Sequence, residues 1–209
     1  MPQFRRFAAL MAVLALLVSA TACAAAQPTA IPGHPRVRIE MADGHSMLFE
    51  LYPEFAPATV ANFLALVDAK FYDGLTFHRL IKSALIQGGD PNGDGTGGSG
   101  KTIKGEFSAN GFKKNTLSHT FGIISMARTK DYDTADCQFF ILAGDGSAST
   151  LDGKYAAFGR LIEGNSVLLS LAAKPVVENA STGEVSQPVE PVVIAHIVRV
   201  AEGTPTPAA

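Results

Sequence analysis

Apolar residues along this chain occur in short runs separated by Gly, Pro, Asn and Asp, a pattern typical of short strands joined by turns. Strands are predicted at residues 36–40, 47–51, 79–87, 122–127, 138–142, 156–161 and 191–200. Apolar residues at helical spacing predict two helices, one from Pro57 to about residues 73–74 and a short one over residues 165–173. Many short strands with two helices favour a mainly β fold, a closed antiparallel barrel with the helices at its ends.

The segment over residues 77–90 carries one Arg and one Gln on an otherwise largely apolar stretch. If the run 79–87 is a single strand, its alternation places Arg79, Leu85 and Gln87 on the same side. A guanidinium stays protonated at physiological pH and presents a rigid fork of donors. A fixed cation and an amide beside an apolar surface, without a nucleophile or an acid/base pair, suit a reaction that breaks no covalent bond.

The N-terminal residues have the composition of an export signal. Arg5 and Arg6 precede an apolar run at residues 7–18, and small residues follow at 19–23. The run is shorter than the roughly 20 residues that a membrane span needs. We therefore expect a signal peptide at 1–22, a flexible tether at 23–35, one folded domain at 36–201 and a disordered tail at 202–209, in a protein that is periplasmic or extracellular.

Two processing routes remain open at the end of this signal. Cys23 stands where a lipoprotein carries its acylated cysteine, which would tether the protein to the membrane, but Ala20 replaces the Leu of that motif. Residues 20–22 equally satisfy an ordinary A-x-A cleavage site. The other cysteine, Cys137, then has no partner within the domain, so no disulfide is expected and Cys137 should be a small buried residue.

Residues 95–102 match the phosphate-loop pattern G-x-x-x-x-G-K-[ST] letter for letter. That motif works only when a helix begins directly after the loop, and Ile103-Lys104-Gly105 breaks a helix here. The overlapping residues 90–95 match the first half of a calcium loop, but its twelfth position is Lys101 instead of Glu. We expect a surface loop without a nucleotide.

Metal and nucleic-acid binding are also unsupported. The five histidines, at positions 34, 45, 78, 119 and 196, lack metal-ligand spacing, and we expect His78 and His119 to be structural hydrogen-bonding residues. A formal net charge of −2 provides no basic stripe for nucleic acid. No Ser-His-Asp order or paired carboxylate points to a hydrolase.

Several motifs together resemble those of the cyclophilins, in that family's order and approximate spacing from about residue 36 to residue 200. The resemblance implies an eight-stranded antiparallel barrel with two helices, and catalysis of cis/trans isomerisation at X-Pro peptide bonds. It further implies a monomer that needs no cofactor and binds proline-containing polypeptides. Together with the export signal, it predicts an isomerase that speeds protein folding outside the cytoplasm. The matching segments are Phe77-His78-Arg79, residues 86–91, residues 95–98, Ser125-Met126-Ala127, residues 138–141, residues 151–154 and Phe158-Gly159.

The resemblance also assigns the catalytic residues. Arg79 would be the donor that stabilises the twisted amide, and Gln87 would hold the Arg or the substrate backbone. Phe140 would form the proline pocket together with Leu85 and Leu151. The remaining contacts, to the peptide backbone, would come from Ala127 and Gln138.

Four substrate-side positions depart from the family pattern. Ala84 stands where most cyclophilins have a large aromatic residue, which removes an apolar wall of the pocket. Thr150 replaces the Trp of drug-binding members, so we expect weak binding of cyclosporin-type ligands. Tyr155 replaces a frequent His, and Arg128 replaces a common Asn in the segment that contacts the backbone.

A second hypothesis follows from Ala84: a proline-peptide-binding or chaperone module on the same scaffold, with weak or no turnover. A third and weaker one is nucleotide binding through residues 95–102.

Overall fold

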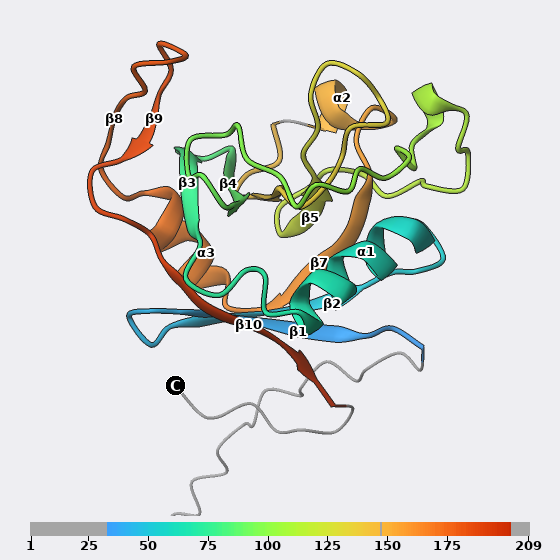
Figure 1. The fold of residues 1–209 in the computed structure, drawn as a ribbon, viewed down its shortest axis with the longest axis horizontal. Helices are drawn as coiled ribbons and strands as arrows, with labels where there is room; N and C mark the ends of the chain where they lie inside the picture. Colours follow the sequence, from blue (N-terminus) through green and yellow to red (C-terminus); the bar gives the residue numbers. More distant parts are fainter. Residues whose placement is uncertain (1–32, 147, 202–209) are drawn as a thin grey trace, which may run out of the picture.

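A single antiparallel sheet of eight strands forms the body of the fold (Figure 1). The structure is a computed structural model and describes residues 33–146 and 148–201. The strands lie side by side in the order β10-β1-β2-β7-β5-β6-β4-β3. Their bounds are β1 (Arg36–Met41), β2 (Ser46–Leu51), β3 (Thr76–Ile81), β4 (Leu85–Asp90), β5 (Ile123–Met126), β6 (Phe139–Leu142), β7 (Ala157–Glu163) and β10 (Ile194–Val200).

The sheet curls into a half-barrel, so the prediction of a closed barrel was wrong. Its edge strands β10 and β3 approach one another only near the start of β3, where Thr76 and Val193 form an isolated bridge. The backbone N–H of Phe77 donates there to Val192 at 2.9 Å. Beyond that contact β10 pairs along β1 and β3 pairs along β4, so no ladder closes the described sheet.

The two predicted helices are present. Helix α1 (Pro57–Asp68) buries its apolar side, including Val60, Phe63 and Val67, and lies against β10. Helix α3 (Asn165–Ala172) packs against β2, β3 and β4. Helix α1 ends about five residues before its predicted end, because Lys70 adopts a left-handed conformation (φ 56°) and the chain turns to bury Tyr72. Two further short helical segments were not predicted: the 3-10 helix η1 (Ser108–Asn110) and α2 (Ala148–Leu151).

The predicted single strand over residues 79–87 is a hairpin in the structure. Strand β3 ends at Ile81 and β4 begins at Leu85, with Ser83 in a left-handed conformation (φ 58°) between them. An alternating pattern continues across so short a turn, which is why the sequence reads as one strand. As a consequence, Arg79 on β3 and Gln87 on β4 are directly paired on adjacent strands.

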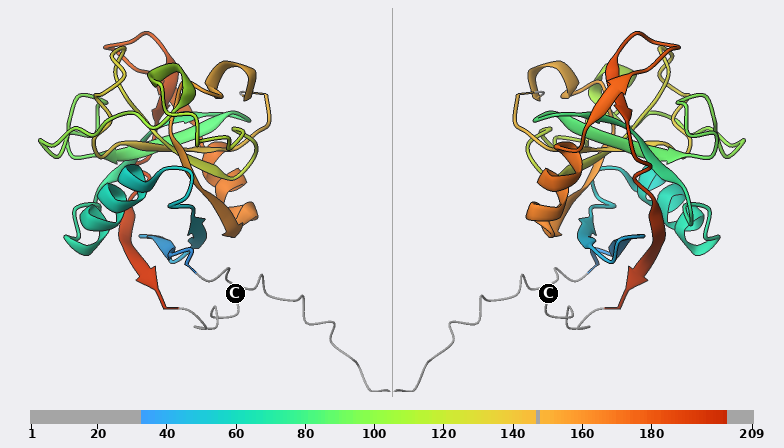
Figure 2. Two further views of the ribbon diagram at one scale, coloured as in Figure 1. Left: turned by 90° about the vertical axis from the view of Figure 1, so that its right-hand side faces the viewer. Right: turned by 90° about the vertical axis from the view of Figure 1, so that its left-hand side faces the viewer.

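A second hairpin, β8 (Val176–Glu178) with β9 (Val185–Pro188), was missed by the sequence analysis. It stands out from the body of the fold above β3, as the side views also show (Figure 1, Figure 2). Val177 and Val185 are exposed on it, and the buried position on β9 is a serine, Ser186, so no buried apolar alternation marks these strands in the sequence.

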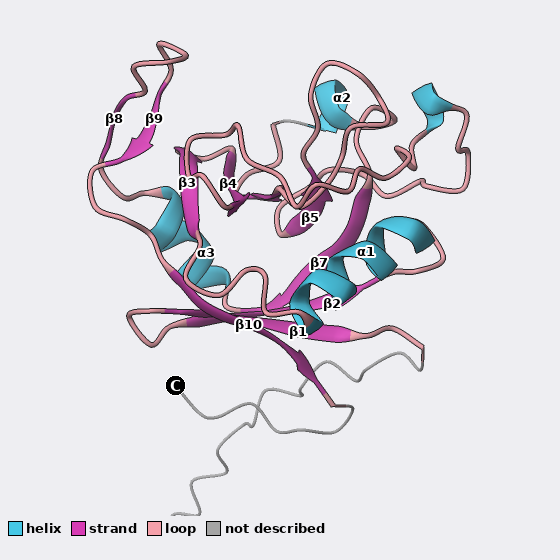
Figure 3. Ribbon diagram, in the orientation of Figure 1, coloured by secondary structure: helices cyan, strands magenta, loops and turns pink. Residues whose placement is uncertain are grey.

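The core lies inside the curl, and the long connections gather on one side of it. Phe139 packs edge-on against Phe63, Tyr72 and Phe77 at centroid separations of 5.5 to 5.9 Å. Cys137 is buried and free, as predicted, and burial raises the pKa of its thiol to about 12. The connections around β5 and α2 are mostly irregular (Figure 3). Among the described residues, no helix combines the length and apolar character of a membrane span.

A carboxylate from a distant segment caps helix α1. Ala56, the residue before the helix, provides no side-chain cap. Glu106 accepts hydrogen bonds from the backbone N–H groups of Ala58 and Thr59 at 3.0 and 2.8 Å, and from the Thr59 hydroxyl at 2.7 Å. A buried negative charge at this end is favoured by the helix dipole, and it ties α1 to the loop that precedes β5.

We predict that Glu106→Ala lowers the free energy of unfolding by about 2–4 kcal/mol, because buried donors at the helix start lose a charged acceptor. Glu106→Gln keeps one acceptor and should cost roughly 1–2 kcal/mol. Urea denaturation followed by circular dichroism measures both. The exposed Glu190→Gln is the control, and equal stability of all variants would contradict the capping role.

Candidate active site

One row of side chains crosses four neighbouring strands on the outer face of the sheet. Arg79 on β3 is paired with Gln87 on β4, Gln87 with Phe140 on β6, and Phe140 with Ser125 on β5. Residues directly opposite one another in an antiparallel ladder share a face, so these four side chains form one line. Leu80, Ile86, Ile141 and Ile124 form the adjacent row, whose side chains point into the core.

The Arg79 guanidinium is held by two partners. Its Nη1 donates to Gln87 Oε1 at 3.2 Å, and its Nε and Nη2 donate to the two carboxylate oxygens of Glu184 at 2.6 and 2.8 Å. About a third of the Arg79 side chain is exposed. The hydrogen bonds from Arg79 hold the pKa of Glu184 below its ordinary value, so the pair is ionised at neutral pH.

The amide groups beside Arg79 continue this network to the Gly-rich loop. Gln87 Nε2 donates to Gln138 Oε1 at 3.0 Å, and Gln138 Nε2 donates to the carbonyl oxygens of Gly95 and Gly97 at 3.1 and 2.9 Å. Gln138, predicted to contact a peptide backbone, therefore also fixes the loop against the sheet. Asp90 holds the start of the same loop, because its carboxylate accepts hydrogen bonds from the backbone N–H groups of Asn92, Asp94 and Gly95. In a calcium loop this first carboxylate would bind the metal instead.

Aromatic rings surround Phe140. The His119 ring stacks on it at 6.0 Å and an interplanar angle of 17°, and the Tyr155 ring meets it edge-on at 5.6 Å. Phe140 is almost fully buried, yet it lies outside the core cluster, as a wall of the outer face should. The carbonyl of Leu151 accepts from the Tyr155 N–H at 3.2 Å, which places the end of α2 beside these rings.

The two predicted apolar residues of the β3–β4 hairpin are half-buried. Leu85 lies two residues before Gln87 on β4 and so shares its face. Ala84 lies in the turn, where its carbonyl accepts from the Ala143 N–H at 2.8 Å. Its methyl group adds little to the wall that a larger side chain would build there.

Arg128 is enclosed by three aromatic rings. Its guanidinium carbon lies 4.4 Å from the centroid of Tyr155, 4.9 Å from that of Tyr132 and 5.3 Å from that of Phe107. Its Nε also donates to the Lys154 carbonyl at 3.0 Å. Arg128 thus braces Tyr155 from behind through cation–π contacts.

A cavity of about 480 Å3 adjoins the row. Gln87, Ala127 and Gln138 line it together with Arg128 and the Gly-rich loop at residues 95–98. Arg79, Phe140, Leu85 and Leu151 do not line it. Gln87, which does, is paired with both Arg79 and Phe140, so the cavity lies directly beside the row. The loop is not followed by a helix: Ile103 forms an isolated bridge with Ala135.

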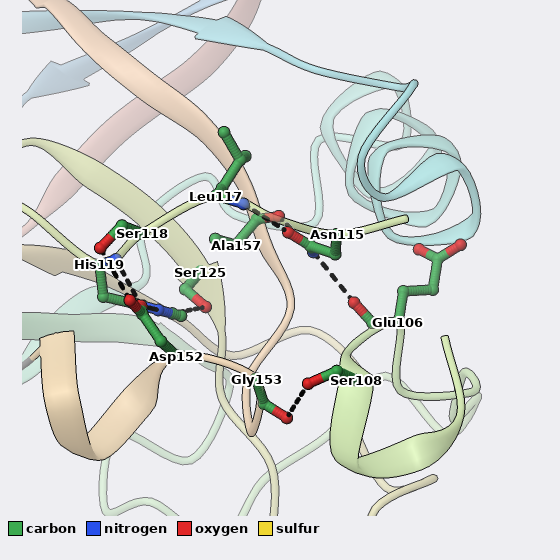
Figure 4. A network of polar contacts seen from close by, with 10 residues as sticks. All are labelled: Glu106, Ser108, Asn115, Leu117, Ser118, His119, Ser125, Asp152, Gly153 and Ala157. Atoms are coloured by element: carbon green, nitrogen blue, oxygen red, sulfur yellow. Dashed lines mark hydrogen bonds and ion pairs between the residues drawn. The ribbon is translucent and has the colours of Figure 1, made fainter. Parts of the chain in front are cut away.

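His119 lies between Asp152 and Ser125 in an order that looks like a hydrolytic triad (Figure 4). Its Nδ1 is 2.8 Å from Asp152 Oδ1 and its Nε2 is 3.0 Å from Ser125 Oγ. Both His119 and Ser125 are fully buried, so no substrate could reach the hydroxyl. This cluster supports Phe140 from behind, which confirms the structural role predicted for His119. The same prediction is wrong for His78, because its ring nitrogens have no hydrogen-bond partner among the described residues.

Glu184 was missed by the sequence analysis. It lies in the β8–β9 turn within a stretch of Ser, Thr and Gly, and no spacing connects it to an Arg that is 105 residues away. Cys23 lies outside the described residues, as do the predicted signal peptide, most of the tether and the tail.

The family model "Cyclophilin type peptidyl-prolyl cis-trans isomerase/CLD" matches residues 36–199. Peptidyl-prolyl cis-trans isomerase B of Bacillus subtilis is 47% identical over 122 residues, which are 58% of this chain and 80% of that protein.

Two solved structures of a cyclophilin-type peptidyl-prolyl cis-trans isomerase from Cryptosporidium parvum share the fold at 33% sequence identity. One superposes with a TM-score of 0.69 and covers 80% of this chain and 98% of its own. The other, determined in the presence of the dipeptide Ala-Pro, has a TM-score of 0.68 and covers 79% and 99%.

We predict that acid destabilises the fold through His119 and His78. Burial lowers the pKa of both side chains in the folded state. A histidine with a lowered folded pKa contributes its full stability above the unfolded-state pKa of about 6.5, and this contribution is lost as pH falls through the folded value. The free energy of unfolding should therefore fall as the pH is lowered from 7 to 5.

Urea denaturation across this range measures the loss. The Hε1 resonance of His119 in NMR should keep its neutral position at pH values where the urea-unfolded chain is half protonated. A His119 resonance that titrates together with the unfolded chain would contradict the prediction.

Proposed function

The chain belongs to the cyclophilin family of peptidyl-prolyl cis-trans isomerases, and we propose that it performs this isomerisation outside the cytoplasm with Arg79 as the catalytic donor. The observation that supports this most is the row Arg79–Gln87–Phe140, which places fixed N–H donors next to an aromatic wall.

The chemistry needs a donor but no nucleophile. Amide resonance gives a rotation barrier of roughly 18–20 kcal/mol, so uncatalysed X-Pro isomerisation takes tens to hundreds of seconds. In the twisted state the proline nitrogen regains a localised lone pair. A cationic N–H aimed at that nitrogen stabilises the twisted amide more than either planar form, which lowers the barrier.

The apolar wall beside Arg79 suits the proline ring. Phe140 and Tyr155 provide aromatic faces, with Leu85, Leu151 and Ala84 at the margin. The relative from Cryptosporidium parvum was crystallised with Ala-Pro, a dipeptide of this class. We propose that the peptide backbone runs along Ala127 and Gln138 toward the neighbouring cavity, and that Arg128 acts by bracing Tyr155.

Export is proposed from the sequence of residues 1–22. Rotation about a peptide bond consumes no ATP, so the reaction suits a compartment without it. Strand β1 and the end of β10 lie on the side of the fold opposite α2 and the β8–β9 hairpin (Figure 1). A tether joined to β1, with or without acylation of Cys23, would therefore leave the site accessible. Intact mass of the mature protein distinguishes the two processing routes.

We predict that Arg79→Ala reduces kcat/KM for an X-Pro peptide by about 10²- to 10³-fold, because a preorganised donor to the twisted amide is lost. Arg79→Lys should recover little, since an ammonium lacks the planar fork that Gln87 and Glu184 orient. Exchange NMR between the cis and trans peptide signals measures the rate directly. Equal rates in wild type and Arg79→Ala would remove Arg79 from the mechanism.

The alternative function, a peptide-binding module with weak turnover, rests on the small side chain of Ala84. We predict that Ala84→Phe lowers KM several-fold, because an aromatic side chain in the turn adds apolar contact for the proline ring. Peptide titration followed by chemical shifts gives the affinity, and exchange NMR gives the turnover. Peptide binding without any exchange in the wild type would favour the binding module.

A further inference from the structure

The β8–β9 hairpin places the carboxylate of Glu184 against Arg79, the proposed catalytic residue. Glu184 binds the side of the Arg79 guanidinium formed by Nε and Nη2, with one oxygen to each nitrogen, at 2.6 and 2.8 Å. Such a two-pronged pair fixes the plane of a guanidinium as well as its position. Strand β9 packs beside β3, so the hairpin and the sheet meet at this point.

The turn that carries Glu184 is well ordered by its own hydrogen bonds. The Asn179 backbone N–H donates to the Glu184 carbonyl at 2.8 Å, and the Asn179 side-chain oxygen accepts from Ser181 N–H at 2.9 Å. Gly183 adopts a left-handed conformation (φ 70°) that lets the turn close. Glu184 is therefore delivered from a defined turn, and Ser186, buried on β9, adds a hydrogen bond to its carboxylate.

The contacts leave a defined part of Arg79 free. A guanidinium has five N–H donors. Glu184 accepts two of them and Gln87 a third, so one N–H remains on each Nη for a substrate. Glu184 occupies the edge formed by Nε and Nη2, and Gln87 binds Nη1 at the other end of the fork.

We propose that Glu184 is a positioning residue for Arg79: it orients the guanidinium so that the two remaining N–H groups face the substrate amide. The inference rests on the proposed role of Arg79 as the catalytic donor. It adds a residue from outside the curled sheet to the machinery of the site.

Glu184 has two opposing effects: it orients the Arg79 guanidinium, and its negative charge offsets the positive charge of Arg79. The gain from orientation is the larger of the two. Without Glu184, a single hydrogen bond of 3.2 Å to a neutral amide would hold a long side chain that is already one-third exposed. Arg would then regain much of its rotamer freedom, which must be lost again in each transition state. The negative charge of Glu184 is itself partly exposed, so water screens its effect on the substrate.

The test compares kcat and KM of wild type, Glu184→Ala and Glu184→Gln by exchange NMR with an X-Pro peptide. Glu184→Ala should lower kcat roughly 5- to 20-fold, with KM changed less than about twofold, because orientation of the reacting group is lost while the apolar pocket is kept. Glu184→Gln should fall between, since its amide accepts one of the two hydrogen bonds. Glu178→Gln, on the same hairpin and exposed, is the charge-matched control and should equal wild type.

A spectroscopic readout separates positioning from a structural effect. The Nε–H signal of Arg79 should be protected from exchange with water in wild type and lose that protection in Glu184→Ala, while urea denaturation shows the fold intact. An unchanged or raised kcat in both Glu184 variants, with Arg79→Ala inactive, would overturn the inference alone. Full activity in Arg79→Ala would instead overturn the proposed function.

Discussion

The register of β3, β4, β6 and β5 is the constraint on which the site depends. Because Arg79, Gln87, Phe140 and Ser125 are paired in succession, one line of side chains faces outward while the next line, from Leu80 to Ile124, faces the core. A slip of one residue in any of these strands would exchange the two lines, placing a guanidinium in the core and a leucine or isoleucine in solvent. The energy that holds the active row in place is therefore the burial of the apolar row next to it.

The site is also supported from behind. Phe140 can present a rigid face only if the layer beneath it does not move, and that layer is the buried ring of His119, fixed at both nitrogens by Asp152 and Ser125. Arg128 does the same for Tyr155 through its aromatic enclosure. Polar groups that are fully satisfied inside a protein rigidify their surroundings. The triad-like order of His119 is thus a feature of structure, and its burial is what separates it from a hydrolase site.

Much of the fold and the chemical character of the site could be predicted from the sequence, because both depend on local patterns. The spacing of apolar residues predicts strands such as 138–142 and the helix beginning at Pro57, and Arg79 is conspicuous on an apolar stretch. The turn at Ser83 could not be seen, since alternation runs through it unbroken. Closure of the barrel could not be judged either, because it depends on whether two strands that are distant in sequence diverge after one bridge. Glu184 is the extreme case: its turn is polar and exposed, so nothing in its neighbourhood marks it out.

The two acceptors on Arg79 illustrate why the missed residue matters. Gln87 arrives with the hairpin that carries Arg79, so any chain that forms β3 and β4 in this register places the amide correctly. Glu184 arrives from an independent element, whose position is set by the Asn179 turn and by the packing of β9 on β3. The orientation of the cation therefore depends on two residues that are 105 positions apart in sequence and lie in contact in the structure. A neutral acceptor at 3.2 Å limits where Nη1 can go, whereas a charged, two-pronged acceptor at 2.6 and 2.8 Å fixes the plane. Under the proposed mechanism, the sheet supplies the donor Arg79 and the β8–β9 hairpin supplies the carboxylate that orients it.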